Sequence, residues 1–453
     1  MQVIIMGAGK IGSNICETLG TENYDICVID HDEEALEKIT QNYDVLGVLG
    51  NGSSFEVQKE ANRGEDHVFI AVTANDEMNL LACIIAQELG AFFTIARVRG
   101  QEYAFHLEDL KQMLKVSMLL NPERLVAEEI SRLVHFPTAL SVEPFANRRV
   151  NMVQIEVPEE HLLVGENLIR YRQECPETLI CTIIREEEVI IPTGTTRIQS
   201  GDRLFIIGTL NKLDRVYTLF SSTHDTLKSL LIVGGGRITY YLLHFLGNMR
   251  RQLDIKVIEA DEKICEMLSQ EFPSIDVIWG DGTDQDILEE EGIRHYDSVI
   301  SLTGVDEENI LISMFSHTMG VPRNITKVNR LRLLDVIGES TLQTIVTPHE
   351  SAANDIIHVI RSLTQNRGSN LEAVYRIGRG EVEAIQFQMT GNAGVCNIEL
   401  KDLLLQEDTL IALIIRGQEI IIPGGFDRIL PGDRIIVVNK GLHIVNATDI
   451  KAD

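Results

Sequence analysis

Several features are missing from this sequence of 453 residues. It has no uncharged apolar run long enough to cross a bilayer, so we expect no direct insertion into lipid. It also lacks a positive charge balance, and its net charge of -28 disfavours nucleic acid and anionic lipid as binding partners. No basic and apolar leader precedes the first predicted strand at Gln2, so we expect no targeting segment.

Catalytic and metal-binding signatures are missing as well. The seven cysteines include no CxxC pair and several lie in apolar runs, which favours buried thiols in a reducing cytoplasm. The twelve histidines form neither an HExxH motif nor a Cys/His cluster, and no GxSxG or GxxxxGK[ST] motif occurs. We therefore expect no metal site, no catalytic residue and no enzymatic activity.

A large internal repeat organises what is present. Residues 2–12 and 229–239 are each an apolar run that leads into a glycine turn. Later segments recur in the same order: 27–30 as 256–259, 50–53 as 280–283, 73–76 as 303–306, 95–98 as 325–328, and 121–123 as 347–349. An apolar strand that enters a glycine turn and then a helix is typical of a Rossmann unit. The repeat therefore predicts two such units.

The segments that follow each Rossmann unit also repeat. Residues 190–194 and 200–203 recur as 421–425 and 431–434, and short β-branched runs occupy 153–157, 179–184, 189–191 and 204–207. The predicted fold class is α/β. Two Rossmann-like parallel-sheet domains, residues 1–124 and 228–350, are each followed by a small α+β domain, residues 139–223 and 368–450. Polar residues 221–225 are the predicted joint between the halves.

The first glycine turn fits a nucleotide pyrophosphate. Gly7 permits the tight turn, Gly9 admits the phosphate to bare backbone N–H groups, and Gly12 lets the helix pack against the strand. Asp30 ends the next strand at about the spacing of a carboxylate that binds both ribose hydroxyls, which favours NAD+ or NADH over their 2′-phosphorylated forms. ATP and ADP present the same adenosine. The alternatives are a plain packing turn and a surface acid.

The second copy differs from the first in two places. Thr239 stands where the third glycine is expected, so we expect a different pocket, although Gly234 to Gly236 and Glu259 are retained. The alternative is a retained fold whose site has lapsed. Arg97 and Lys327 occupy one place in the two copies, where a cation could reach phosphate oxygens, or could instead form a solvated salt bridge.

Taken together, these motifs resemble the RCK (regulator of potassium conductance) family, also described as TrkA-N and TrkA-C domains, over nearly the whole chain. The resemblance rests on the GAGKIG start at Gly7, on residues 73–76 and on residues 96–98. It implies a cytoplasmic homo-oligomer, in the form of a tetrameric ring, that lies peripherally on the inner membrane. It further implies that the ring gates a potassium transporter of the TrkH/TrkG type in response to NAD+/NADH or ATP/ADP.

The resemblance also implies site residues in each copy. In the first copy, the phosphate and ribose contacts of the family fall on Gly7, Ala8, Gly9, Lys10, Ile11, Asp30, Asn51, Thr73, Ala74 and Arg97. In the second copy, they fall on Gly234, Gly235, Gly236, Arg237, Ile238, Glu259, Asp281, Thr303 and Lys327. Two other functions stay open: an NAD-dependent oxidoreductase with His106 or Lys111 as its acid, and a scaffold with vestigial pockets.

Overall fold

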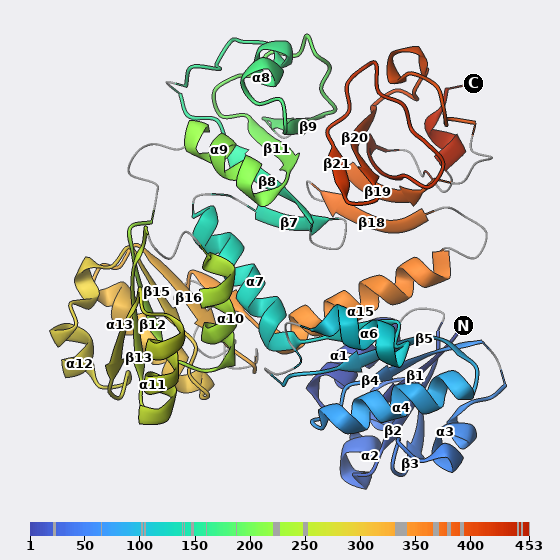
Figure 1. The fold of residues 1–453 in the computed structure, drawn as a ribbon, viewed down its shortest axis with the longest axis vertical. Helices are drawn as coiled ribbons and strands as arrows, with labels where there is room; N and C mark the ends of the chain where they lie inside the picture. The colour runs from blue at the N-terminus through green and yellow to red at the C-terminus, as the bar shows by residue number, and fades with distance from the viewer. Residues whose placement is uncertain are drawn as a thin grey trace. The chain divides into compact units, whose positions relative to one another are not determined.

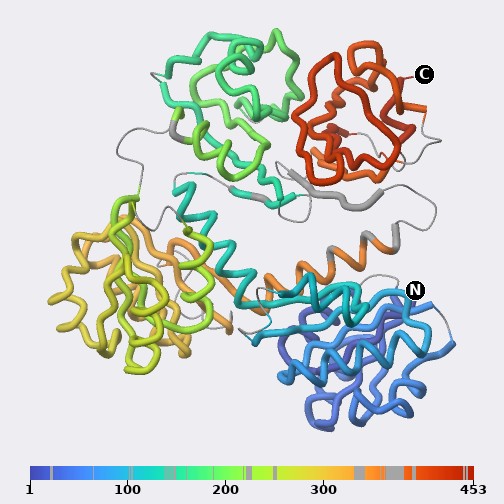
Figure 2. The backbone as a smooth tube through the Cα atoms, viewed as in Figure 1, coloured from blue at the N-terminus to red at the C-terminus, as the bar shows by residue number. Residues whose placement is uncertain are grey.

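The computed structural model describes most of the chain. It covers residues 1–20, 24–64, 66–100, 103, 106–137, 139, 141–145, 149–159, 161–186, 188–220, 227–247, 252–330, 342–365, 371–377, 382–389, 394–441, 444 and 447–452. The predicted joint at residues 221–225 lies outside these residues. The chain forms two compact units, one of Met1–Ser131 with Leu227–Ile357 and the other of Arg132–Thr226 with His358–Asp453. Figure 2 follows the backbone through them by colour.

The first unit contains two parallel sheets with the same strand order. The first sheet runs β3-β2-β1-β4-β5-β6 and the second runs β14-β13-β12-β15-β16-β17. Their strands pair in parallel throughout. The central strands are apolar because helices cover both faces of such a sheet, and every residue of β1 is buried. This strand order is that of a Rossmann fold.

The two lobes of this unit have matching elements (Figure 1). The first lobe consists of β1 (Gln2–Met6), α1 (Lys10–Leu19), β2 (Asp25–Asp30), α2 (Glu33–Asn42), β3 (Leu46–Leu49), α3 (Phe55–Ala61), β4 (His67–Ala71), α4 (Asp76–Glu88), β5 (Ala91–Arg97), α6 (Leu107–Leu114), β6 (Met118–Leu120) and α7 (Pro122–His135). The second consists of β12 (Ser229–Val233), α10 (Arg237–Leu246), β13 (Asp254–Glu259), α11 (Glu262–Glu271), β14 (Asp276–Trp279), α12 (Gln285–Glu290), η2 (Ile293–His295), β15 (Ser298–Ser301), α13 (Asp306–Thr318), β16 (Arg323–Lys327), β17 (Thr344–Val346) and α15 (Pro348–Gln365).

The second unit contains two small antiparallel sheets of equivalent topology. One runs β10-β9-β11-β8-β7 and the other runs β21-β20-β22-β19-β18. The elements of the first are β7 (Ser141–Phe145), β8 (Val150–Glu156), α8 (Leu168–Glu174), β9 (Leu179–Arg185), β10 (Glu188–Ile190), β11 (Arg203–Gly208) and α9 (Leu210–Phe220). Those of the second are β18 (Leu371–Ile377), β19 (Val382–Gln388), η6 (Leu400–Asp402), β20 (Thr409–Arg416), β21 (Glu419–Ile421), β22 (Arg434–Lys440) and η7 (Ala447–Ile450).

One hydrophobic core joins these two small sheets. Phe145, Met152 and Phe205 of the first sheet pack with Leu413 and Ile436 of the second. Cations at the rim donate to backbone carbonyls across the same interface; Arg149, for example, donates to the carbonyls of residues 417 and 418 at 3.0 and 2.6 Å. The predicted class, two Rossmann-like domains each followed by a small α+β domain, is confirmed. Among the described residues, no helix is long and apolar enough to span a membrane.

Candidate functional site

The first glycine turn leads from β1 into α1. Gly7 has a φ of 118°, and a Cβ atom there would lie 3.2 Å from the backbone N of Thr73, so the turn approaches the end of β4 closely. Gly9 is the N-cap of α1, and no side chain in the described structure caps this helix. A Cβ atom at Gly9 would meet no described atom within 4 Å. The N–H groups of the first helical turn have no acceptor inside the helix, and the space at the Cβ position of its N-cap is open within the described structure.

The neighbouring residues of this turn divide by burial. Ala8 and Ile11 are buried, whereas Gly9 and Lys10 are exposed. The side chain of Ile11 thus belongs to the core, and only its backbone is available to a ligand at the turn. The Lys10 ammonium, in contrast, is free to move toward an anion. An exposed glycine and cation at a helix N-terminus form a suitable site for phosphate.

Asp30 connects the glycine turn to the end of β2. Its carboxylate accepts from the backbone N–H of Ala8 at 2.6 Å and from that of Asp32 at 3.0 Å. The oxygen that accepts from Ala8, Oδ2, has a second lone pair that can accept from a further donor such as a hydroxyl. His31 Nδ1 lies 3.0 Å from an oxygen of the same carboxylate. Asp30 is therefore held in place beside the turn by backbone donors.

Asn79 joins the ends of β4 and β5. Its buried side chain accepts from the N–H and hydroxyl of Thr73 at 3.1 and 2.6 Å. It donates to the carbonyls of Thr73 and Arg97 at 3.1 and 3.0 Å. One amide therefore sets the positions of two candidate site residues on neighbouring strands. Ala74, the next residue after Thr73, is exposed.

Arg97 is a buried cation. Its side chain is 8% exposed, its Nη1 donates to the carbonyl of Thr73 at 3.4 Å, and its Nε has no hydrogen-bond partner in the described structure. Burial, followed by the charge of Arg99, lowers the pKa of Arg97. It is not the solvated surface group that was the alternative interpretation. A buried cation is costly without an anion in contact, so this position favours a negatively charged ligand.

The second glycine turn reproduces this arrangement. Gly234 has a φ of 102°, and a Cβ atom there would lie 2.9 Å from the backbone N of Thr303. Gly236 is the N-cap of α10, is exposed, and has open space at its Cβ position within the described structure. Glu259 accepts from the N–H of Gly235 at 2.5 Å and from that of Asp261 at 2.8 Å. Arg237 is exposed like Lys10, and Ile238 is buried like Ile11.

Thr303 and Lys327 are also placed as their counterparts are. Asn309 accepts from the N–H of Thr303 at 2.7 Å and donates to the carbonyls of Thr303 and Lys327 at 3.2 and 3.1 Å. Lys327 is 9% exposed and its Nζ donates to the carbonyl of Thr303 at 2.6 Å. Burial lowers the pKa of Lys327. Each lobe thus carries a buried cation at the carboxyl end of its fifth strand.

Thr239 is accommodated without filling the turn. A Cβ atom at the equivalent Gly12 would overlap the carbonyl oxygen of Gly7, as the sequence led us to expect. In the second lobe, however, the Thr239 hydroxyl donates to the carbonyl of Gly234 at 2.5 Å, and the side chain is fully buried. The branched side chain is therefore buried and bonded to the backbone of the turn.

Asn51 and Asp281 occupy the ends of the third strands. Asn51 Oδ1 accepts from the N–H and hydroxyl of Ser53 at 3.0 and 2.8 Å. Asp281 Oδ1 accepts in the same way from Thr283 at 2.9 and 2.7 Å, and these bonds lower the pKa of Asp281. Both side chains are exposed.

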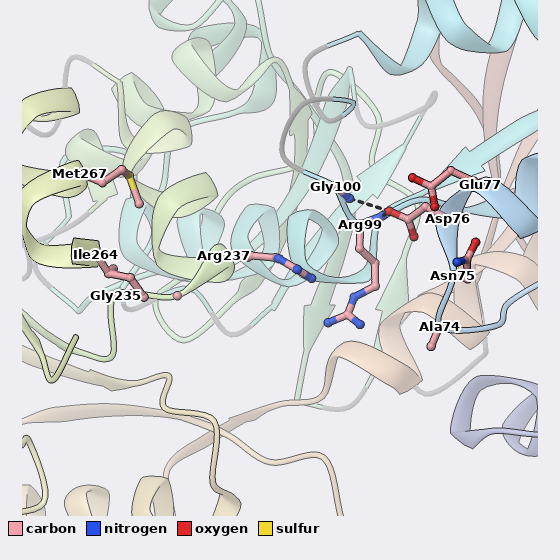
Figure 3. Close-up of a pocket in the computed structure, with 11 residues that line it drawn as sticks. Ala74, Asn75, Asp76, Glu77, Arg99, Gly100, Gly235, Arg237, Ile264 and Met267 are labelled. Atoms are coloured by element: carbon pink, nitrogen blue, oxygen red, sulfur yellow. Dashed lines mark hydrogen bonds between the residues drawn. The ribbon is translucent and has the colours of Figure 1, made fainter. Parts of the chain in front are cut away.

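A cavity of about 550 Å³ lies between the two lobes of the first unit (Figure 3). Its lining comes from Ala74, Asn75, Asp76, Glu77, Arg99 and Gly100 in the first lobe and from Gly235, Gly236, Arg237, Ile264 and Met267 in the second. Figure 3 shows the side chains of Arg99 and Arg237 pointing toward one another. The glycine turn of the second lobe and two cations therefore border one space.

Sequence reasoning missed several residues that build these sites. Asp76 accepts from the N–H groups of Arg99 and Gly100 at 2.7 and 2.8 Å, which fixes the loop that follows β5. Asn79 and Asn309 were missed as well. The signal was available, because both stand six residues after the threonine of the repeated segment. A buried amide at the same offset in two copies indicates a shared structural role.

His106 and Lys111, the candidate acids of the oxidoreductase alternative, pair with acids of their own helix. His106 Nδ1 lies 3.6 Å from Asp109 and Lys111 Nζ lies 3.5 Å from Glu108, so each pairs with an acid of α6. His106 is exposed, which is unfavourable for a general acid beside a nicotinamide. Among the residues that the structure describes, no group of three His, Cys, Asp or Glu side chains is placed to hold a metal ion.

Comparison with known proteins shows the family. The model of the TrkA-N domain matches residues 3–122 and 230–348, and the model of the TrkA-C domain matches residues 152–221. The Trk system potassium uptake protein TrkA of Vibrio alginolyticus is 31% identical over 97% of this chain and 96% of its own length. The chain belongs to the TrkA family. The TrkA of Haemophilus influenzae is 29% identical over 98% of this chain and 95% of its own length.

A solved structure supports the fold of this TrkA-family chain. The GsuK channel bound to NAD matches 97% of this chain and 77% of its own length, with a TM-score of 0.61 and 16% sequence identity. At this identity the match supports the arrangement of two Rossmann lobes and two small domains. The resemblance inferred from the glycine turns and the repeat is therefore confirmed at the level of family and fold.

Proposed function

We propose that this chain is a nucleotide-binding regulatory subunit of potassium uptake. The single observation that carries the proposal is the pairing, in each lobe, of an open helix N-terminus with a buried cation, Arg97 or Lys327. These groups suit a diphosphate. The names of the Vibrio and Haemophilus relatives describe potassium uptake, which supports the physiological role.

In the first site, NAD+ or NADH is the proposed ligand, with ATP or ADP as the alternative. The backbone from Gly7 to Ile11 would hold the pyrophosphate, with Lys10 and Arg97 as its cations. Asp30 would accept from the ribose hydroxyls, since backbone donors already orient its carboxylate. Asn51, Thr73 and Ala74 would border the ligand at the ends of the third and fourth strands. GsuK, which has been solved with NAD, supports this choice.

In the second site, the corresponding residues are proposed as contacts: Gly234, Gly235, Gly236, Arg237, Ile238, Glu259, Asp281, Thr303 and Lys327. Thr239 leaves the phosphate position open, because its hydroxyl bonds to the carbonyl of Gly234. Arg237 and Arg99 add positive charge at the cavity beside the turn. We therefore propose that this site also binds a nucleotide.

The partner in this proposal is a membrane potassium transporter of the TrkH/TrkG type. The chain would assemble as a tetrameric ring in the cytoplasm and associate with the inner membrane through that transporter. Leu81 of α4 and Leu311 of α13, at equivalent positions of the two lobes, are 50% and 64% exposed, which supports an interface between copies. The domain bounds 1–124, 139–223, 228–350 and 368–450 are proposed for the four modules of each copy.

Potassium flux through the reconstituted transporter tests the regulatory role. Nucleotide can shift the ring between two shapes only by binding them with different affinities, so flux should change with NADH or ATP at saturating protein. Flux that responds to this protein but stays constant over the whole nucleotide titration would contradict gating. A variant with Gly9→Asp and Gly236→Asp provides the control that lacks both phosphate positions.

The oxidoreductase alternative has a separate test. If the chain were an NAD-dependent dehydrogenase, the absorbance of bound NADH would fall when a carbonyl substrate is added. Under our proposal the absorbance stays constant for every candidate metabolite. The pairing of His106 and Lys111 with acids of α6 disfavours this alternative.

A further inference from the structure

We propose that Trp279 stacks on the base of a nucleotide bound in the second site, so that this site selects purine nucleotides. The inference rests on the proposed function, because it requires a nucleotide at the second glycine turn. It goes further by assigning the base-binding group and by distinguishing the two sites.

The register of the sheet places Trp279 beside the ribose-binding carboxylate. Trp279 is the last residue of β14, and its partner on β13 is Glu259. Side chains alternate between the faces of a strand, so residues paired in register lie on the same face of the sheet. Glu259 reaches the N–H of Gly235 from this position. The indole therefore stands next to the carboxylate that orients the ribose.

A hydrogen bond holds the indole in a defined position. Its Nε1 donates to the carbonyl of Ala260 at 3.0 Å, across the turn that follows Glu259. The side chain is nevertheless 65% exposed. An aromatic ring that is anchored at its polar edge and open on the rest of its surface can receive a flat ligand without rearrangement. Anchoring also lowers the entropy that stacking would otherwise cost.

The direction of a bound nucleotide leads to this ring. In a Rossmann site the pyrophosphate lies at the helix N-terminus and the ribose lies at the acid that ends the second strand. In the second lobe these groups are Gly236 and Glu259. The adenosine half occupies the carboxyl ends of the first three strands, here β12, β13 and β14. The base beyond the ribose therefore lies over the ends of β13 and β14, where Trp279 is located.

The first lobe shows that this ring is particular to the second site. The register partner of Asp30 is Leu49, an aliphatic residue that is 53% exposed. His31 follows Asp30, whereas Ala260 follows Glu259, and the indole donates to the carbonyl of Ala260. Trp279 is also the only tryptophan of the sequence. The two sites therefore differ at the proposed base position, and the second site contains an intrinsic fluorophore.

The expected effect follows from the strength of stacking. Base–aromatic stacking contributes enough that its loss weakens binding by roughly five- to hundred-fold. A purine offers a larger face than a pyrimidine, so we expect ADP to bind more tightly than UDP. Trp279→Leu reproduces the residue of the first lobe and should fold normally, because most of the indole is exposed.

The experiment uses the full-length chain with Gly9→Asp, which leaves the second site as the one to be measured. Tryptophan fluorescence should fall on addition of ADP, and calorimetry should show weaker binding of UDP. Adding Trp279→Leu should lower the affinity for ADP by about tenfold and remove most of the preference for ADP over UDP. Trp279→Phe should retain most of the ADP affinity and most of the preference for ADP over UDP.

The outcomes separate the two levels of the proposal. Unchanged ADP affinity in Trp279→Leu, with wild-type melting, would overturn the role of Trp279 and leave nucleotide binding intact. Absence of ADP and NADH binding to the wild-type chain would overturn the proposed function, and this inference with it. An equal loss of affinity for ADP and UDP in Trp279→Leu would also overturn the role of Trp279, because a general structural effect does not discriminate between bases.

Discussion

Replacement of Asn79 by alanine should damage the first lobe and its site together. The side chain makes four hydrogen bonds, two to the Thr73 amide and hydroxyl and two to the carbonyls of Thr73 and Arg97. Alanine leaves the N–H of Thr73 and the carbonyl of Arg97 without these partners inside the protein. Each buried group left unsatisfied costs about 1 to 3 kcal/mol, so we expect a loss of roughly 2 to 4 kcal/mol after relaxation.

The assay must resolve the lobes, because a chain of several domains does not unfold in one step. Hydrogen exchange measured peptide by peptide should show faster exchange in β4 and β5 of Asn79→Ala, with β15 and β16 unchanged. Asn309→Ala is the matched control and should show the reverse pattern. The loss of stability in Asn309→Ala should be slightly smaller, because it removes three such hydrogen bonds to Thr303 and Lys327 rather than four.

Binding should follow the same division. Since Asn79 positions Thr73 and Arg97, its replacement should weaken nucleotide binding at the first site. The quenching of Trp279 fluorescence by ADP at the second site should stay unchanged. If the free energy of opening that hydrogen exchange reports for β4 stays within about 0.5 kcal/mol of the wild type, the role of the amide is refuted, because a difference that small is typical of surface substitutions.

Three further outcomes follow from single positions. Gly9→Asp should abolish binding at the first site without lowering the melting temperature, since a Cβ atom there meets no described atom within 4 Å; calorimetry with NADH that matches the wild type would contradict the phosphate position. Burial, and then the charges of Lys10 and Arg97, lower the pKa of His349 from 6.5 to about 4, so the folded state favours the neutral ring. The stabilisation of the folded state by the neutral His349 ring is complete above pH 6.5 and is lost as the pH falls toward 4. Denaturation across this range should show a loss of roughly 2 kcal/mol, allowing for partial exposure, that His349→Gln removes. Thr182→Val should raise the melting temperature of the second unit, because the buried hydroxyl has no partner among the described residues, and a gain of about 1 kcal/mol is expected; a lower melting temperature would show that the hydroxyl is in fact bonded.

The strands could be predicted because burial leaves a local signature. Residues 2–6 are apolar without interruption since helices cover both faces of a parallel sheet, and this pattern is visible without a structure. The predicted strand at 179–184 corresponds to β9 (Leu179–Arg185) and that at 204–207 to β11 (Arg203–Gly208) for the same reason. The repeat then predicted a second copy of these elements, because two copies with the same spacing form one fold twice.

The amides and the cavity could not be predicted from local patterns. Asn79 stands in a helix, where an amide is usually solvated, and its role depends on the ends of β4 and β5 meeting above it. The cavity requires the lobes to be placed together, since Arg99 and Arg237 come from different lobes. Such contacts between distant segments have no periodicity in the sequence.

Thr239 is one expected difference between the two glycine turns, and the structure shows how its side chain is accommodated. A single sequence marks it as a departure from glycine at the close contact of helix and strand, and the pocket was expected to change there. In the structure its hydroxyl donates to the carbonyl of Gly234, and Gly236 stays exposed. A second difference lies at the ends of the second and third strands, where Trp279 is paired with Glu259 and Leu49 with Asp30. Under our proposal, two sites that share the phosphate-binding turn but differ at the base would bind the same nucleotide with different affinities.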